Sequence, residues 1–288
     1  MKNQSINNGR DKLSNLISFI ENFVLEIIIQ IKNINFYFFY YLSNRFYFLK
    51  KNISLKNILL NQKIYIIGLG PSINNYDISK LRSKNIIMVN RSFSHPEYSK
   101  LKPKFHLFID NKLAYGRWPI SYIDSILEKS PEVKIILNAN WYYLDKFSKF
   151  RNNSQFYWVK LNHVSLLNGK YKHDITKMIS VGGTVMECAI TLSIYLGSKD
   201  INIMGLDGNG LAKLMCNENS HWDGKDKDYQ EHNSLLYAND MITSSRGIKQ
   251  WHAMSKKIKK TDVKVFNLTK EGIFDAYEFK DFEESFKE

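Results

Sequence analysis

The sequence contains very little cysteine, which limits the classes of protein to which it can belong. Only Cys188 and Cys216 occur among 288 residues, too few for a disulfide framework. Cys188 falls in an apolar run typical of a helix, where a buried free thiol is the ordinary case. Residues 1–16 are polar, and no small-residue cleavage site follows an apolar stretch, as it would in a secretory signal. We therefore expect a cytoplasmic protein.

Long uninterrupted hydrophobic runs are missing as well. Residues 23–29 are mostly apolar, but Glu21, Glu26, Gln30 and Lys32 interrupt or border the run. A helix that spans a bilayer needs about 20 predominantly apolar residues with few charges. We expect that this segment does not cross a membrane.

The sequence also lacks the signatures of nucleic-acid binding. It has no zinc-finger spacing, no aromatic motif of the RRM type and no striped arrangement of lysines. Its net charge of +13 nevertheless favours anionic partners. We expect these partners to be nucleotide phosphates, acidic sugars or an anionic membrane surface, and not nucleic acid.

Residues 1–60 differ in texture from the rest and predict an N-terminal helical extension. Aromatic and cationic residues are interleaved over 36–51. One interpretation is peripheral contact of residues 23–51 with the inner face of the cytoplasmic membrane, where rings and cations suit the headgroup region. The other is a helical hairpin that packs on the catalytic domain or on a second subunit of an oligomer.

From Gln62 onward, short apolar runs alternate with amphipathic stretches, which predicts an α/β fold. Runs of β-branched and aromatic residues between polar turns are typical of strands, and they occur at 63–68, 86–90, 105–110, 133–138, 156–159, 201–205 and 263–267. Helices are expected at 77–84, 119–129, 140–150, 184–196 and 247–260. This alternation implies a Rossmann-like, mostly parallel sheet flanked by helices. We expect one domain at 61–288, with a lid at about 211–240.

The turn after the first expected strand has the chemistry of a phosphate site. Gly68 and Gly70 allow the backbone to approach a phosphate, and Ser72 can donate a further hydrogen bond. Asn74 stands where the third glycine of a dinucleotide fingerprint would be, which makes a nicotinamide dinucleotide less favoured. A tight turn without a ligand is the simpler alternative.

Two further motifs follow later strands. Residues 179–184 place Gly182 and Gly183 before an apolar helix, which suits either an anion site or ordinary helix capping. Asp207 follows the strand 201–205, where ligands of open parallel sheets collect. The alternative roles for Asp207 are to cap a helix or to anchor a loop.

The polar run 217–232 is long for a connection and predicts a loop over the site. It supplies His221 and His232 as candidate bases near neutral pH. Asp226 and Asp228 match a D-x-D pattern of metal-dependent glycosyltransferases, but they lie among other charges and are better interpreted as a solvated run.

Four segments in order carry a resemblance to a known family: GLGPS (68–72), MVNRSF (88–93), ISVGG (179–183) and LGSKDINIMGLDGNG (196–210). Together they resemble the bacterial sialyltransferases of glycosyltransferase family 42. They are also similar to the related motility-accessory-factor and 6-hydroxymethylpterin pyrophosphokinase-like group. The resemblance covers about residues 62–270 and leaves the N-terminal extension unexplained.

The resemblance to the sialyltransferases implies a Rossmann-like domain with a lid, a CMP-linked donor and no metal or other cofactor. It implies that the nucleotide and donor are bound by Gly68, Gly70, Pro71, Ser72, Asn90, Arg91, Ser180, Val181, Gly182, Gly183, Asp207 and Asn209. The catalytic base would be His221 or His232, and these two cannot be separated by alignment. Tyr229 and Tyr237 are candidates to assist the leaving phosphate. Leu69 replaces a polar residue usual in this turn, which removes one expected contact.

These observations lead to one principal hypothesis and two alternatives. The principal one is transfer of a sialic-acid-like nonulosonic acid from CMP to a bacterial surface glycan or glycolipid. The first alternative is pyrophosphoryl transfer to a pterin alcohol, with Mg²⁺ held by Asp207, Asp223 and Asp226. The second is a nucleotide-binding module without catalytic activity.

Overall fold

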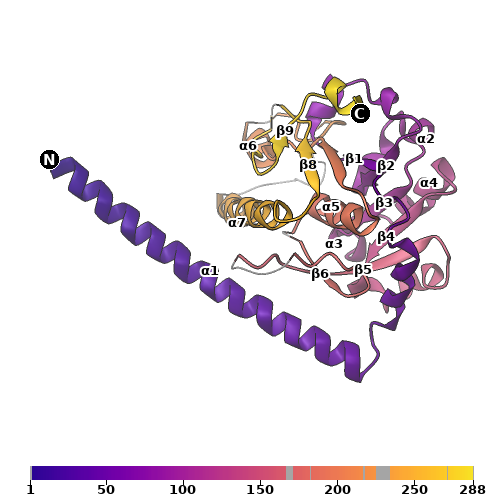
Figure 1. Cartoon of the computed structure of the whole chain (residues 1–288), viewed down its shortest axis with the longest axis horizontal. Coiled ribbons are helices and arrows are strands. Elements are labelled where there is room, and N and C mark those ends of the chain that lie inside the picture. Colours follow the sequence, from indigo (N-terminus) through magenta and orange to yellow (C-terminus); the bar gives the residue numbers. More distant parts are fainter. Residues whose placement is uncertain are drawn as a thin grey trace.

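A computed structural model of the chain describes residues 2–166, 171–181, 183–216, 218–224, 234–270 and 272–287. Within this part of the chain, nine strands form one sheet in the order β6-β5-β4-β3-β2-β1-β7-β8-β9, and every neighbouring pair is parallel (Figure 1). The strands are β1 (Lys63–Ile67), β2 (Asn85–Val89), β3 (Phe105–Phe108), β4 (Lys134–Asn138), β5 (Phe156–Asn162), β6 (Met178–Ser180), β7 (Asp200–Met204), β8 (Lys264–Asn267) and β9 (Glu278–Phe279). The Rossmann-like α/β fold expected from the sequence is confirmed.

Helices of two kinds connect these strands. The α-helices are α1 (Lys2–Leu42), α2 (Tyr98–Leu101), α3 (Asn111–Ala114), α4 (Ser121–Lys129), α5 (Val185–Tyr195), α6 (Gly210–Met215) and α7 (Ser234–Ile258). The 3-10 helices are η1 (Tyr47–Leu55), η2 (Pro71–Asn75), η3 (Ile78–Leu81), η4 (Asn90–Ser94), η5 (Ala139–Trp141), η6 (Asp145–Phe150) and η7 (Glu283–Phe286). The expected helices at 77–84 and 140–150 are therefore short 3-10 segments, whereas α7 begins well before residue 247.

The strands are apolar throughout because both faces of the sheet are covered. In β1, Ile64 and Ile66 belong to one apolar cluster and Tyr65 and Ile67 to the other, as the two-residue period of a strand requires. Helices α5 and α7 cover the first face. Their buried residues Cys188, Trp251, Met254 and Ile258 belong to the same cluster as Ile64 and Ile66. The second face is covered by α4 and the 3-10 segments.

The N-terminal extension is one continuous helix. Figure 1 shows α1 running past the edge of the sheet at β5 and β6 and on beyond the body. The hairpin expected as one alternative is not formed, because residues 2–42 are helical without a break. The sequence has no glycine or proline between Gly9 and Gly68 that would favour a turn. The described residues contain no helix that is both long enough and apolar enough to cross a membrane.

The segment after α1 is part of the core. Leu49 and Leu55 of η1 are almost completely buried. The side-chain amide of Asn52 donates to the carbonyl oxygens of Trp158 (2.8 Å) and Ile175 (2.6 Å). These two hydrogen bonds tie η1 to β5 and to the segment that precedes β6.

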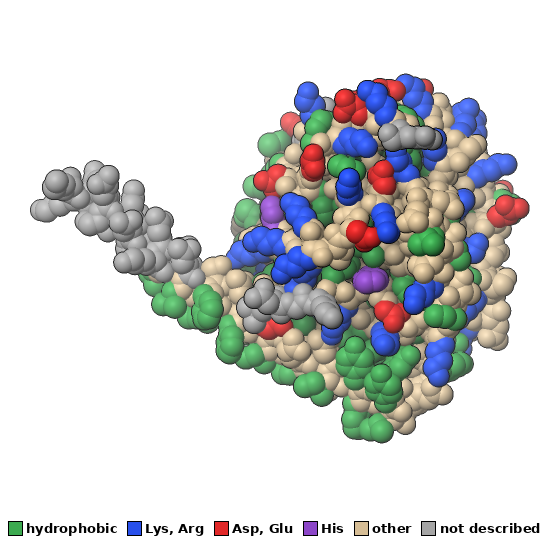
Figure 2. All heavy atoms as spheres, viewed as in Figure 1, with side chains coloured by type: hydrophobic (Ala, Val, Ile, Leu, Met, Phe, Trp, Pro, Cys, Tyr) green, Lys and Arg blue, Asp and Glu red, His purple; other side chains and the backbone are tan. Residues whose placement is uncertain are grey.

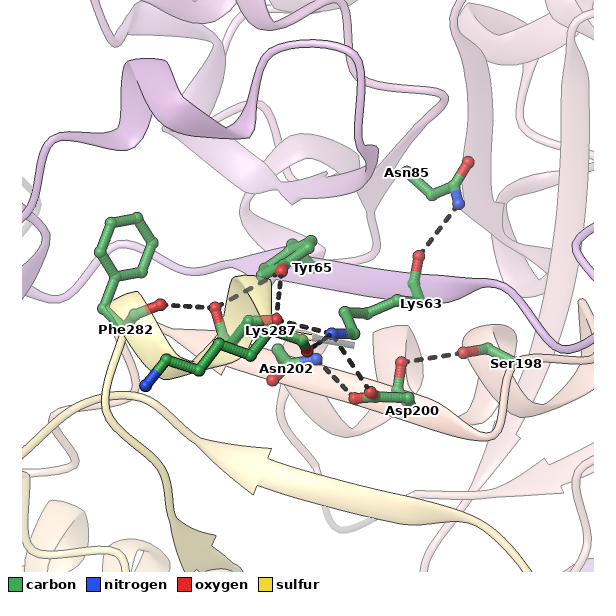
Figure 3. Close-up of polar contacts among 9 residues, drawn as sticks. Lys63, Tyr65, Asn85, Ser198, Asp200, Asn202, Phe282 and Lys287 are labelled. Carbon is green, nitrogen blue, oxygen red and sulfur yellow. Dashed lines mark hydrogen bonds and ion pairs between the residues drawn. The ribbon is translucent and has the colours of Figure 1, made fainter.

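The C-terminal segment closes the amino-terminal end of the sheet (Figure 3). Lys63 Nζ donates to the carbonyl oxygens of Ser285 (2.6 Å) and Lys287 (3.1 Å), and Tyr65 Oη donates to the same Ser285 carbonyl (2.9 Å). Lys63 also lies 3.6 Å from the carboxylate of Asp200 on β7. This cluster stabilises the end of the sheet opposite the carboxyl ends of the strands.

Candidate functional site

A cavity of about 500 Å³ lies at the carboxyl ends of β2 to β6 and at the start of α5. Because side-chain amides dominate its polar lining, we call it the amide cavity. It is lined by Lys32, Asn90, Ile109, Asp110, Asn111, Asn138, Leu161, Asn162, His163, Val181, Gly183, Thr184 and Val185. The carboxyl ends of parallel strands are where α/β proteins collect their ligands.

Asn90 follows β2 and lines this cavity. Its backbone has φ of 46°, the left-handed region that asparagine tolerates better than most residues. The residue is only 7% exposed, and its Oδ1 has no hydrogen-bond partner among the residues that the structure describes. A buried polar atom without a partner is costly. It is therefore an indication that a ligand supplies the missing donor.

A buried pair behind the cavity holds Asn90 in place. His106 Nε2 lies 2.8 Å from the carbonyl oxygen of Asn90, and His106 Nδ1 lies 2.9 Å from Tyr98 Oη. Because a carbonyl oxygen can only accept, the ring proton is on Nε2 and the tyrosine hydroxyl donates to Nδ1. Burial lowers the pKa of His106 to about 4, although its hydrogen bond to Asn90 acts in the opposite direction. The imidazole is therefore neutral at physiological pH, and it positions Asn90 from behind.

The ends of β3 and β4 add further polar atoms to the amide cavity. Asp110 caps α3, with its Oδ1 accepting from the Lys112 amide (2.9 Å). Asn138 Oδ1 accepts from the Asn140 amide (3.0 Å) in the same way. Each side chain is thus oriented by one oxygen, which leaves the second carboxylate oxygen of Asp110 and the amide nitrogen of Asn138 available to a ligand.

The extension contributes to the cavity through Lys32, which is the cation in its lining. Helix α1 is held here by Asn162 at the end of β5, whose Nδ2 donates to the Ile29 carbonyl (3.3 Å) and to Asn33 Oδ1 (3.0 Å). The helix therefore completes one wall of the site as well as extending away from the body.

A second cavity of about 570 Å³, which we call the α7 cavity, borders the first. Its lining includes Arg246, Gln250 and Trp251 from α7 and Phe274. The two cavities share His163, Gly183 and Thr184. A histidine thus stands where two ligand-sized spaces meet.

His163 has the protonation state that a base requires. Burial lowers its pKa below the ordinary histidine value, the contact with Gln250 opposes this effect, and the charge of Lys32 adds to it. Its Nδ1 lies 3.3 Å from Gln250 Oε1, an oxygen that can only accept, so the ring proton is on Nδ1. Nε2 makes no hydrogen bond to any residue that the structure describes, which leaves it as a free acceptor.

The predicted turn after β1 forms a separate cluster with the turn after β7. The amides of Gly68 and Gly70 donate to the carbonyl oxygens of Met204 (2.9 Å) and Gly205 (3.0 Å). Ser72 donates to both carboxylate oxygens of Asp207, from its amide (3.3 Å) and its hydroxyl (2.8 Å).

These contacts give the turn a structural role. A Cβ on Gly70 would overlap Asp207 Oδ2, so glycine is needed for this approach. Pro71 starts η2 directly after the turn. Gly68, Gly70, Ser72 and Asp207 are thus brought together, and the amides of the first three each donate to a protein acceptor.

The start of α5 is closed by a capping box. The Thr184 amide donates to Glu187 Oε2 (3.0 Å), and the Glu187 amide donates to Thr184 Oγ1 (3.4 Å). Val181 and Gly183 line the amide cavity with Asn90, so three of the residues predicted for donor binding meet there. Ser180 ends β6 and its amide donates to the Lys172 carbonyl (3.2 Å), while Gly182 lies outside the described residues.

The remaining predicted residues lie elsewhere. The amide of His221 donates to Gly224, and its neighbour Trp222 donates from its amide to the Leu69 carbonyl (2.9 Å). The Trp222 ring lies 4.7 Å from that of His95. His221 is therefore beside the β1 turn, and it does not line either cavity.

Three more predicted residues do not line either cavity. The guanidinium of Arg91 lies over the ring of Trp118, Asn209 precedes α6 with Oδ1 buried and unpartnered, and Tyr237 is on α7. His232, Tyr229 and Asp226 lie outside the described residues. The roles predicted for all these residues remain predictions.

Sequence reasoning missed most of the amide cavity. Asp110 and Asn138 end apolar runs that had been recognised as strands, and a polar residue at that position was the available signal. Nothing in the sequence pattern singled out His106 or His163. Among the described residues, no group of three or more histidine, cysteine, aspartate or glutamate side chains is arranged to hold a metal ion.

Comparison with protein families identifies the family of the chain. Residues 38–209, more than half of its length, match the family described as 6-hydroxymethylpterin diphosphokinase MptE-like. The chain belongs to the MptE-like family. No curated protein matches the chain. The matched residues include β1 to β7 and therefore every strand end that lines the amide cavity, and the membership assigns the chain to a nucleotide-related, transferase-like group.

Proposed function

We propose that this MptE-like protein transfers a nonulosonic acid, a sialic-acid-like sugar, from a CMP-linked donor to a bacterial surface glycan, without a metal ion. The observation that carries the proposal is the amide cavity, in which Asn90 offers a buried acceptor without a partner. The resemblance of its motifs to bacterial sialyltransferases supplies the donor class.

The chemistry of the cavity supports a hydroxyl-rich ligand that carries one or two negative charges. Amide side chains both donate and accept, which suits sugar hydroxyls and the edge of a pyrimidine base. Asn90 Oδ1 can accept from the exocyclic amino group of cytosine, and Asn138 has an amide nitrogen left to donate. Lys32 offers positive potential for the donor's carboxylate.

The arrangement of two cavities around His163 supports group transfer between two substrates. With the donor in the amide cavity and the acceptor in the α7 cavity, the acceptor oxygen bonds to the anomeric carbon as the bond from that carbon to the CMP phosphate oxygen breaks. The electron pair of that bond leaves with CMP, and the hydroxyl proton passes to His163 Nε2. His163 thereby joins His221 and His232 as a candidate base, and its lowered pKa keeps it ready to accept.

The first experiment identifies the nucleotide by thermal unfolding of the purified protein with CMP, UDP, GDP or ATP, each with EDTA or with Mg²⁺. A bound ligand stabilises only the state that binds it, so a selective rise in Tm with CMP in EDTA is expected. Selective stabilisation by ATP with Mg²⁺ would overturn the proposal in favour of pyrophosphoryl transfer.

The second experiment separates the candidate bases by turnover of CMP-sialic acid, measured as CMP release. His163→Ala should reduce turnover by about 10²–10⁴-fold with little change in CMP binding, since a general base contributes on this scale. His252→Ala is the matched control, because His252 is a partly exposed histidine of α7 that pairs with Asp275. Equal turnover in both variants would assign the base to another residue.

Pyrophosphoryl transfer is the second candidate, because the matching family is described as 6-hydroxymethylpterin diphosphokinase MptE-like. That reaction generally uses Mg²⁺ held by carboxylates and phosphates. In the amide cavity the carboxylate is Asp110, whereas Asp207 is engaged by Ser72 and Asp223 is exposed. A requirement for Asp110 and Mg²⁺ together in ATP turnover would support this candidate.

A further inference from the structure

Helix α1 has two faces of different character, and one of them packs on the body. Ile29 and Phe36 are almost completely buried on this face. Glu26 accepts a hydrogen bond from Ser165 (2.8 Å), and Tyr40 donates to the Thr176 carbonyl (3.4 Å). In the amino-terminal half of α1, the hydroxyl of Ser18 accepts a hydrogen bond from Lys249 of α7 (3.2 Å).

The opposite face is apolar and exposed. From Leu13 to Tyr41, apolar residues recur at intervals that alternate between four and three residues. Figure 2 shows hydrophobic side chains along the outer edge of α1. The central members, Ile17, Ile20, Val24, Ile27, Ile31 and Ile34, are between 45% and 68% exposed. We call this row the α1 stripe.

The spacing of the α1 stripe identifies the kind of partner. Steps of four and three repeat every seven residues, the 3.5-residue period of a coiled-coil seam. Isoleucine or valine stands at both seam positions in the centre of the stripe, and isoleucine at both positions favours assemblies of three or four helices over two. The body covers the opposite face at Ile29 and Phe36, and the seam stays about half exposed although Ile20 and Val24 also line a cavity of about 290 Å³ that includes Arg246 and Lys249.

The charge distribution favours a protein partner over a lipid surface. Between Leu13 and Leu42 the charged residues are Glu21, Glu26 and Lys32, two negative and one positive. A helix that lies on an anionic membrane typically carries lysine and arginine along its polar face. This segment has no such excess of positive charge.

The stripe is also large enough for a stable assembly. At about half exposure, each of its side chains offers on the order of 90 Å², and the whole row offers about 800 Å² per copy, the area that each partner contributes to a standard-size interface. An exposed apolar area of this size is unusual for a monomer.

We propose that α1 binds the α1 helices of other copies of this chain through the α1 stripe, in a parallel, in-register coiled coil of three or four helices. The bodies then surround the bundle at the same level. Because Lys32 and Asn162 tie the same helix to the amide cavity, each copy presents its site on the outside of the assembly.

Cysteine crosslinking tests the register. In a Cys216→Ser background, which removes the exposed native thiol while Cys188 stays buried, Val24→Cys should form a disulfide between copies under mild oxidation. Phe19→Cys is the matched control, because Phe19 is 64% exposed on the same helix but lies off the stripe. Equal crosslinking at the two positions, or none at position 24, overturns the proposed seam.

Light scattering after size exclusion tests the assembly itself. The wild-type chain of 33.9 kDa should elute at three or four times that mass, and Ile20→Asn with Ile27→Asn should reduce it to one. Ile53→Asn is the control, because Ile53 is an exposed isoleucine outside α1. A wild-type monomer overturns the proposal. If that monomer also floats with vesicles of phosphatidylethanolamine and phosphatidylglycerol in a density gradient, the stripe is a lipid contact.

Discussion

His106 allows the architecture of the site to be tested through the pH dependence of stability. The perturbation is His106→Gln, in which the glutamine nitrogen can still donate to the Asn90 carbonyl while Tyr98 loses its acceptor. At pH 7 we expect a loss of about 1–3 kcal/mol in the free energy of unfolding, the usual cost of one buried group left without a partner.

The sign of the pH effect follows from the direction of the shift. Burial lowers the pKa of His106 from 6.5 to about 4 in the folded protein. Between these values the unfolded chain binds a proton that the folded chain does not, so stability rises with pH across this window. The contribution is fully present above pH 6.5 and is lost as the pH falls towards 4. About 1.4 kcal/mol per pKa unit gives a loss of about 3 kcal/mol at the acidic end.

The assay is urea unfolding followed by tryptophan fluorescence at pH values between 4 and 7.5, for wild type and His106→Gln. The pKa values of His95 and His163 are also lowered by burial, and both variants share these histidines. The difference between the two curves therefore isolates His106, and it should shrink as the pH falls. Parallel curves would refute the inference that His106 is buried as the neutral imidazole behind Asn90.

Two further substitutions test the structural clusters on either end of the sheet. Gly70→Ala should lower the free energy of unfolding by about 2–4 kcal/mol in urea titrations, because the new methyl group would displace the carboxylate of Asp207 from Ser72; a neutral effect would contradict the close approach of the two turns. Lys63→Met should cost about 1–2 kcal/mol by removing two hydrogen bonds to the C-terminal segment, and it should speed release of that segment by carboxypeptidase while leaving nucleotide-induced stabilisation unchanged.

The sequence predicted the strands well because a parallel sheet buried on both faces leaves continuous apolar runs. β6 was not recognised as a strand, since its three residues lie in a segment interpreted as a helix entrance. β9 was missed because its two residues are exposed. The segments 77–84 and 140–150 have helical periodicity, but periodicity alone does not separate a short 3-10 turn from an α-helix.

The candidate site was less predictable because it is assembled from strands far apart in the sequence. Asn90, Asp110, Asn138 and His163 become neighbours through the order of the strands, which motif spacing does not reveal. The glycine motifs were visible for a different reason: tight turns demand glycine wherever two backbones approach closely. At Gly70 the close neighbour is the side chain of Asp207. A phosphate in the same place would also require glycine, so the sequence alone does not distinguish the two cases.

The central claim is that the amide cavity binds the nucleotide of a CMP-linked donor through Asn90. Isothermal titration calorimetry of CMP into wild type and Asn90→Ala, both in EDTA, tests it most directly, with Asn239→Ala on the exposed side of α7 as the control. The account predicts that CMP binds wild type and Asn239→Ala with the same Kd. It predicts binding at least about tenfold weaker in Asn90→Ala, since the lost hydrogen bond is worth about 1–2 kcal/mol. Equal affinity in all three proteins, or no binding of CMP to wild type, would contradict it.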